Sequence, residues 1–68
     1  MDKDELLDKP AVSAYLGVPV GTLERWRHHG VGPRGFRIEG GRVRYRRSEV
    51  ERWLSEQEAA ELDRRVSA

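Results

Sequence analysis

Apolar residues recur at helical spacing in the first part of the chain. Val12, Tyr15 and Leu16 lie at positions i, i+3 and i+4, a spacing that puts them on one face of a helix. Asp8 is a suitable N-cap for this helix, and the proline two positions later is tolerated in a first turn. Gly17 ends the helix, because glycine readily takes the left-handed conformation found after helix C-termini.

A second short helix is predicted from Val20 to His29, where Gly30 ends it. Leu23 and Trp26 define its buried side. The residues Gly17-Val18-Pro19 form a tight turn between the two helices. Two short helices joined by a three-residue turn that contains glycine make a helix-turn-helix unit, and in such units the second helix enters the major groove of DNA.

The next stretch alternates apolar and polar residues with the period of a β-strand. The alternation covers residues 36–39 and 42–46, and Gly40-Gly41 between them is typical of a two-residue hairpin turn of the primed type. Parity predicts an inward face made of Phe36, Ile38, Val43 and Tyr45. The outward face is then Arg37, Glu39, Arg42, Arg44 and Arg46.

A third helix is expected after the hairpin. Ser48 and Glu51 have the spacing of a capping box, in which each side chain accepts a hydrogen bond from the other residue's backbone N–H group. Val50, Trp53 and Leu54 then give the helix an apolar face. Beyond Leu54 the apolar residues no longer lie on one face of the helix.

The 68 residues make one domain. We expect a frayed N-terminus over residues 1–5, a folded DNA-binding domain over residues 6–54 and an acidic extension over residues 55–68, which continues the helix, frays or awaits a partner. The order of elements is helix, helix, hairpin wing, helix. The predicted fold class is therefore mostly α with one β-hairpin, an α+β winged helix-turn-helix.

The charges are distributed unevenly along the chain, although the net charge is only +1. Residues 25–47 hold eight arginines against a single acidic residue, a net charge of +7, whereas residues 1–24 and 48–68 each carry −3. A dense cationic zone between two acidic ones indicates a surface that contacts a polyanion. Arginine binds phosphates and guanine edges bidentately, so its exclusive use in this zone favours nucleic acid.

Composition narrows the function classes further. The chain has no cysteine, which excludes disulfides and cysteine zinc sites and fits a reducing compartment. No apolar run is long enough to span a membrane, and we expect a cytoplasmic protein that is nucleoid-associated when bound to DNA. A chain this short has no room for a closed pocket, so we expect no enzyme activity, cofactor, metal or small-molecule ligand.

The residues expected to read the major groove lie opposite the buried side of the second helix. They are Gly21, Thr22, Arg25 and His28. Arg25 is the best candidate for a bidentate contact to guanine, and its alternative is a solvated arginine paired with a nearby glutamate. Thr22 is either a contact to phosphate or a thymine methyl group, or only a local helix-cap group.

The wing and phosphate contacts are expected from seven further arginines: Arg27, Arg34, Arg37, Arg42, Arg44, Arg46 and Arg47. Such a row can also serve only to protect an exposed strand edge, but that needs fewer charges. Arg42, which follows the Gly-Gly turn, is the expected minor-groove probe. The aromatic residues are interpreted as core, and the acidic extension as either a solvated helix end or a docking surface for a protein partner.

Several segments are similar to a known family. Thr-Leu-Glu-Arg-Trp at residues 22–26 and the Gly-Gly-Arg-Val-Arg-Tyr-Arg-Arg-Ser-Glu-Val-Glu-Arg-Trp-Leu run at residues 40–54 resemble the excisionase-like, small MerR-superfamily DNA-binding domains. The resemblance implies that the second helix lies in the major groove and that the wing reaches a minor groove or flanking phosphates. By this resemblance, Thr22 and Arg25 match the groove-reading positions of the family, and residues 42–46 match its wing.

These features together predict a non-enzymatic, sequence-specific double-stranded DNA-binding protein. The resemblance covers both excisionases and small transcriptional regulators. We expect an excisionase, a recombination directionality factor of a phage or mobile element, because the chain is little more than the DNA-binding module; its expected partners are an integrase and further copies of itself on adjacent DNA sites. A small transcriptional regulator using the same contacts is the first alternative. A third is a protein-interaction or antitoxin-like module whose arginine face docks an acidic partner.

Overall fold

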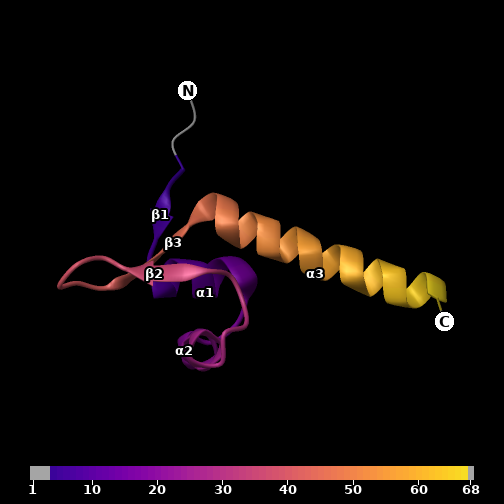
Figure 1. The fold of residues 1–68 in the computed structure, drawn as a ribbon, viewed down its shortest axis with the longest axis horizontal. Helices are drawn as coiled ribbons and strands as arrows, with labels where there is room; N and C mark the ends of the chain where they lie inside the picture. Colours follow the sequence, from indigo (N-terminus) through magenta and orange to yellow (C-terminus); the bar gives the residue numbers. More distant parts are fainter. Residues whose placement is uncertain (1–3, 68) are drawn as a thin grey trace.

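The computed structural model describes residues 4–67 (Figure 1). Its elements in chain order are β1 (Leu6–Leu7), α1 (Lys9–Leu16), α2 (Val20–His28), β2 (Gly35–Arg37), β3 (Val43–Arg46) and α3 (Arg47–Ser67). Three helices and a small antiparallel sheet make an α+β winged helix-turn-helix, which confirms the predicted fold class.

The helix-turn-helix unit forms as its sequence predicts. The Asp8 carboxylate accepts a hydrogen bond from the Ala11 N–H at 2.9 Å and so caps α1. Gly17 ends this helix with φ +73°. The Ser13 hydroxyl donates to the Val18 carbonyl at 2.5 Å, a bond that fixes the turn between the helices. The short turn therefore sets the position of α2 relative to α1.

The apolar face predicted for α1 is wrong at one position. Val12 is completely buried, but Tyr15 is 47% exposed. Helix α1 packs against α2 and β3, and Tyr15 lies at the edge of that contact, in a shallow hollow that it shares with Leu7 and Arg47. A helix of only two turns covers a narrow strip of its neighbours, so one of its three apolar residues remains outside.

The sheet has three strands in the order β1-β3-β2, one more than the predicted hairpin. Strand β1 pairs with β3 through Leu6 opposite Arg46 and Leu7 opposite Tyr45. Two residues are too few to show an alternating pattern, which explains why the sequence did not predict this strand. Strand β3 is therefore central, with a neighbour on each side.

The hairpin differs from its prediction by one residue. Phe36 pairs with Arg44, and the Ile38 N–H donates to the Arg42 carbonyl at 3.2 Å, so the loop has three residues, 39–41, rather than two. Gly40 takes φ +64° in this loop. A shift of one residue moves every side chain of a strand to its other face. The predicted inward positions of Phe36 and Ile38 are therefore wrong: they are 39% and 43% exposed.

The same shift brings two other β2 residues to the inner side of the sheet. Gly35 lies opposite Tyr45, and Arg37 lies opposite Val43. A Cβ atom added to Gly35 would lie 2.7 Å from the Tyr45 ring, so only glycine fits at this position. Arg37, predicted on the outer side, instead lines a hollow beside the first turn of α1.

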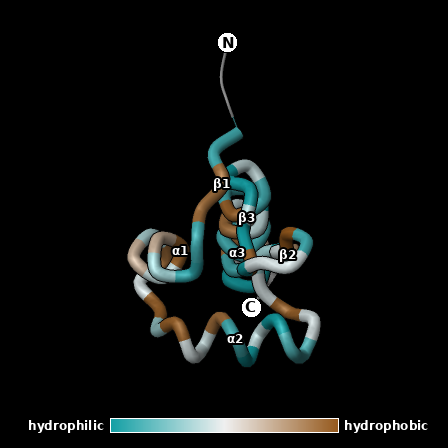
Figure 2. The backbone as a smooth tube through the Cα atoms, turned by 90° about the vertical axis from the view of Figure 1, so that its left-hand side faces the viewer, coloured by the Kyte–Doolittle hydropathy of each residue, from teal (hydrophilic) through white to brown (hydrophobic). Residues whose placement is uncertain are grey.

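The core draws one layer of residues from every helix and from the central strand. Its buried members are Val12, Leu23, Val43, Tyr45 and Val50. Figure 2, viewed from the side of the wing, shows α1 and β2 flanking β3, with α2 below them. The Trp26 and Trp53 rings pack 5.3 Å apart and join α2 to α3. Of the aromatic residues predicted to be core, Tyr45 is buried and the two tryptophans are half-buried, whereas Phe36 is not in the core.

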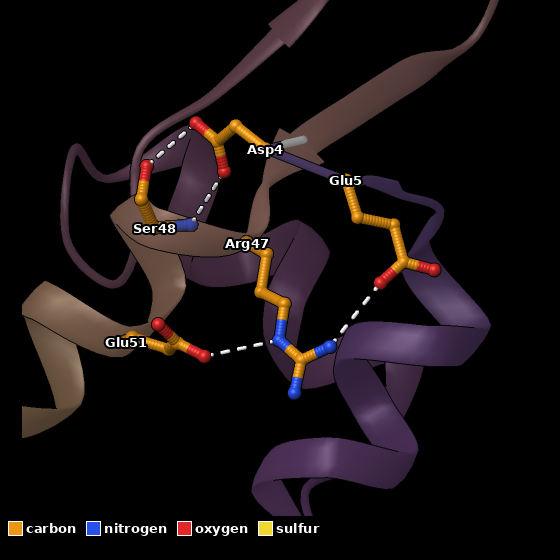
Figure 3. A network of polar contacts seen from close by, with 5 residues as sticks. All are labelled: Asp4, Glu5, Arg47, Ser48 and Glu51. Carbon is orange, nitrogen blue, oxygen red and sulfur yellow. Dashed lines mark hydrogen bonds and ion pairs between the residues drawn. The ribbon is translucent and has the colours of Figure 1, made fainter. Parts of the chain in front are cut away.

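The start of α3 is held by the N-terminal segment rather than by a capping box (Figure 3). The two oxygens of Asp4 accept from the Ser48 N–H at 2.9 Å and from the Ser48 hydroxyl at 2.7 Å. The Glu51 carboxylate, predicted to reach back to Ser48, instead accepts from Arg47 Nε at 3.0 Å. The predicted capping box is wrong because a carboxylate brought by β1 takes both Ser48 groups.

Residues 4 and 5 were expected to fray, and the structure differs there. Glu5 accepts from Arg47 twice, through its carbonyl at 2.9 Å and its carboxylate at 3.2 Å. With the Asp4 contacts, these bonds tie the N-terminal segment to α3. Residues 1–3, also expected to fray, lie outside the described residues.

The acidic extension continues α3 to Ser67, which is one of the three outcomes left open by its sequence. All of residues 55–65 are exposed, and this half of the helix projects away from the rest of the molecule (Figure 1). Leu62 in this half of the helix is 55% exposed. This part of α3 therefore packs against none of the other described elements.

Gly35→Ala should destabilise the fold, because the added methyl group cannot coexist with the Tyr45 ring. We expect chemical denaturation to show a loss of about 1–3 kcal/mol in the free energy of unfolding. Gly21→Ala is the matched control, since its added Cβ would meet open space and alanine favours the helix. An equal loss in both variants would contradict this account of Gly35.

Asp4→Ala should lower the thermal midpoint at pH 7. The hydrogen bonds from the Ser48 hydroxyl and N–H hold the pKa of Asp4 below its ordinary value of 3.8. A depressed pKa stabilises the fold above the unfolded-state pKa, and the effect is lost as the pH falls through the folded-state pKa. The difference between wild type and variant should therefore shrink below about pH 4, whereas Asp63→Ala should cause little change at any pH.

Candidate nucleic-acid interface

The outward face of α2 carries three of the four predicted groove-reading residues. Gly21, Arg25 and His28 are exposed, and Leu23 on the opposite side is 1% exposed. Thr22 is half-buried, and its backbone N–H donates to the Pro19 carbonyl at 3.0 Å. Thr22 therefore lies at the edge of the outward face rather than at its centre.

Arg25 is not paired with a glutamate among the residues that the structure describes. The neighbouring Glu24 instead forms an ion pair with Lys9, whose Nζ lies 3.1 Å from Glu24 Oε2. Within the described part of the chain, Arg25 has no ion-pair partner. The guanidinium group predicted to contact a guanine edge is thus left available on an exposed helix face.

Three wing arginines surround a hollow between the wing and the first turn of α1. Arg37, Arg42 and Arg44 line this space of about 330 Å³ together with Lys9 and Asp8. The arginine hydrogen bonds here go to backbone oxygens: Arg37 donates to the Gly41 carbonyl at 3.4 Å and Arg44 to the Val43 carbonyl at 3.0 Å. Their charges are therefore not neutralised by these contacts, and the hollow suits a phosphate.

A second basic hollow lies under the loop between α2 and β2. Arg27 and Arg34 supply its charged side chains, and residues 30–33 and Gly35 line the rest of it. Gly32, at φ +83°, lets this loop lie against the Trp26 ring, since a Cβ there would lie 2.8 Å from Cε3. The packed loop holds Arg34 at a fixed distance from α2.

The remaining two arginines of the cationic zone have carboxylate partners. Arg46 lies 3.8 Å from Asp4, and Arg47 lies 3.2 Å from Glu5 and 3.0 Å from Glu51. The sequence grouped all eight arginines as DNA contacts, but the fold divides them into six without an ion pair among the described residues and two in a structural network. The Arg47–Glu51 pair has the i, i+4 spacing of a helix, but the Asp4 and Glu5 partners could not be read from spacing, because they come from the distant N-terminal segment.

Tyr45, His28 and His29 are further titratable residues in or next to β3 and α2. Burial raises the pKa of Tyr45, an effect that the nearby positive charge of Arg27 opposes. The His28 and His29 rings lie edge to face at 5.2 Å. Across the described residues, no group of three or more potential metal ligands comes together.

The acidic residues of the distal half of α3 line neither of these two hollows, but Glu56 lines a third one with Arg34. Glu58, Glu61 and Asp63 belong to the part of α3 that projects away from the wing loop, and Arg64 and Arg65 follow them on the same helix (Figure 1). The molecule therefore has a strongly cationic end and a weakly acidic end, since residues 55–65 hold four acidic residues against Arg64 and Arg65. A duplex is attracted to the first and repelled by the second.

Comparison with protein families agrees with this geometry. The family described as helix-turn-helix domain matches residues 6–58, which include both helices of the unit, the whole wing and the first half of α3. The chain belongs to this family. No curated protein and no solved structure matches it. This helix-turn-helix protein binds DNA, and its partner is double-stranded DNA.

The helix-turn-helix match extends further than the domain expected from the sequence, which ended at residue 54. It adds the next turn of α3, where the helix leaves the core. None of the helices among residues 4–67 is apolar enough over a sufficient length to cross a membrane.

The two classes of arginine should behave differently in DNA binding. The slope of log Kobs against log salt concentration is negative. Arg37→Ala or Arg42→Ala should make it less negative by about 0.9 for each phosphate that the variant no longer binds. Arg47→Ala should change this slope less and lower the thermal midpoint, because Arg47 bonds Glu5 and Glu51. Fluorescence anisotropy and thermal unfolding measure the two effects. Arg65→Ala, on distal α3, is the control, and a uniform response of all four variants would contradict the division.

Proposed function

We propose that this protein is a sequence-specific accessory factor of DNA recombination, an excisionase of a phage or mobile element. The observation that carries the proposal is the pairing of an exposed α2 face with two hollows whose arginines form no ion pair among the described residues, in a molecule whose opposite end is weakly acidic. In this proposal α2 reads base edges, the arginines hold phosphates, and an integrase breaks and joins the DNA.

Sequence specificity is assigned to the outward face of α2. Arg25 is proposed to contact a guanine, with Gly21 permitting close approach and His28 lying one turn further along the same face. The wing arginines supply affinity that does not depend on sequence. Arg42 remains the proposed minor-groove probe, since it follows the loop at the tip of the wing.

Several copies are proposed to bind adjacent sites. A single small module covers only about 600–1,000 Å² of DNA-facing surface, too little for tight binding alone. The cationic wing and the acidic end of α3 lie at opposite ends of the molecule, so neighbouring copies can align head to tail with opposite charges in contact. Such an array would bend or coat the DNA between the sites that an integrase must bring together.

A small transcriptional regulator is the second candidate function. It would use the same α2 and wing contacts, because the fold supports both roles. The feature that favours the excisionase is the opposite charge of the two ends, which suits an array of copies on neighbouring sites. A protein-interaction or antitoxin-like module is a weaker candidate, since it would leave the base-reading face of α2 without a role.

The first test is binding to a random duplex of about 20 bp at two salt concentrations, followed by an excision assay with a candidate integrase. We expect binding that weakens steeply with salt, and excision that requires the protein. The Arg42→Ala/Arg44→Ala variant should lose both, whereas Arg64→Ala/Arg65→Ala on distal α3 should retain DNA binding. Binding without any effect on excision, together with protection of a promoter in footprinting, would favour the regulator. Absence of binding at low salt would favour the protein-interaction module.

A further inference from the structure

The outward face of α2 includes one acidic side chain that the groove-reading residues do not account for. Glu24 is exposed and precedes Arg25, the proposed guanine contact. A carboxylate that faces a duplex is repelled by the phosphates and reduces affinity for DNA of any sequence. Its presence on the face that meets the base edges therefore indicates a role in choosing between sequences.

The Lys9 contact fixes this carboxylate from outside α2. Lys9 Nζ donates to Glu24 Oε2 at 3.1 Å, and the two side chains are 28% and 56% exposed. Lys9 is itself held as the first residue of α1 and lines the wing hollow with Arg37. The contact therefore ties the orientation of Glu24 to the rest of the DNA-facing surface.

The ion pair uses only one of the two carboxylate oxygens. Oε1 of Glu24 accepts no hydrogen bond from the described residues, and an ionised carboxylate can accept several. An exposed ion pair stabilises a fold only slightly, so joining α1 to α2 is a weak reason for placing a carboxylate here. The Lys9–Glu24 pair therefore leaves Glu24 Oε1 as an oriented hydrogen-bond acceptor, and an ionised carboxylate cannot donate a hydrogen bond.

We propose that Glu24 is a specificity-determining residue that accepts a hydrogen bond from the N4 amino group of a cytosine in the major groove. The inference rests on the proposed function, in which α2 enters that groove. A carboxylate pairs with cytosine N4, whereas guanine O6 and thymine O4 are acceptors and repel it. Adjacent helix residues diverge by 100°, so Glu24 and Arg25 read different base pairs.

The pairing also lowers the electrostatic cost of this carboxylate. Lys9 offsets part of the repulsion between Glu24 and the phosphates, and it remains close enough to the wing hollow to face the DNA backbone itself. A carboxylate attracts the amino group of cytosine and repels the acceptor oxygens of guanine and thymine. It therefore discriminates between bases by repulsion as well as by attraction. The Lys9–Glu24 pair thus keeps discrimination while limiting the loss of affinity.

The experiment is selection from a duplex library with a randomised core, followed by anisotropy on single-position variants of the selected site. Wild type should prefer cytosine at one position by about tenfold. Glu24→Ala should lose this preference, and Glu24→Gln should shift it toward adenine, which glutamine recognises bidentately. Both variants should bind random duplex more tightly than wild type.

Glu39→Gln is the matched control, because it removes one negative charge from the wing loop within the same cationic zone. It should raise affinity for random duplex and leave the base preferences unchanged. Lys9→Gln should weaken the cytosine preference without removing it, since the carboxylate remains but is no longer oriented.

Unchanged preferences in Glu24→Ala and Glu24→Gln, with salt-dependent duplex binding retained, would overturn the assignment of Glu24 and leave the proposed function intact. Absence of sequence preference in the wild type itself would instead count against the proposed function. Circular dichroism of the two Glu24 variants establishes that α2 remains folded, so a lost preference is not a consequence of unfolding.

Discussion

Burial of the central strand β3 is the interaction on which the remaining structure depends. Val43 and Tyr45 point into the core, where residues of α1, α2 and α3 pack against them. The same strand pairs with β1 on one side and β2 on the other and then runs directly into α3. A chain of this length buries only a modest fraction of its surface, so one strand must serve several contacts at once.

The position of β3 determines the charge pattern of the surface. Its pairing with β1 brings Asp4 and Glu5 to Arg46 and Arg47, which neutralises the two arginines nearest α3. Its pairing with β2 leaves the arginines around the wing without carboxylate partners among the described residues. One strand thereby separates a structural ion network from the basic hollows, and this separation decides which end of the molecule attracts a polyanion.

In the proposed complex, the α2 surface attracts some base edges of the DNA and repels others. In that complex Arg25 offers donors to the major groove, and Glu24, held by Lys9, offers an acceptor beside them. The arginine hollows lie to either side, one against the wing and one under the loop that follows α2. Affinity from the phosphates and selectivity from the base edges are thus assigned to different elements, as DNA recognition requires.

The sequence by itself determined the helices, the turn between them, the presence of a wing and the cationic zone. These features arise from interactions over a few residues: the Asp8 cap, the left-handed Gly17, the alternation around Gly40-Gly41 and the local density of arginine. Only the tertiary structure decided the rest. The three-residue loop that turned Phe36 outward and Arg37 inward, the capture of Ser48 by Asp4 and the Lys9–Glu24 pair all depend on register or on contacts between distant segments. A shift of one residue in strand pairing changes no local propensity and yet exchanges the two faces of a strand, so periodicity alone could not assign them.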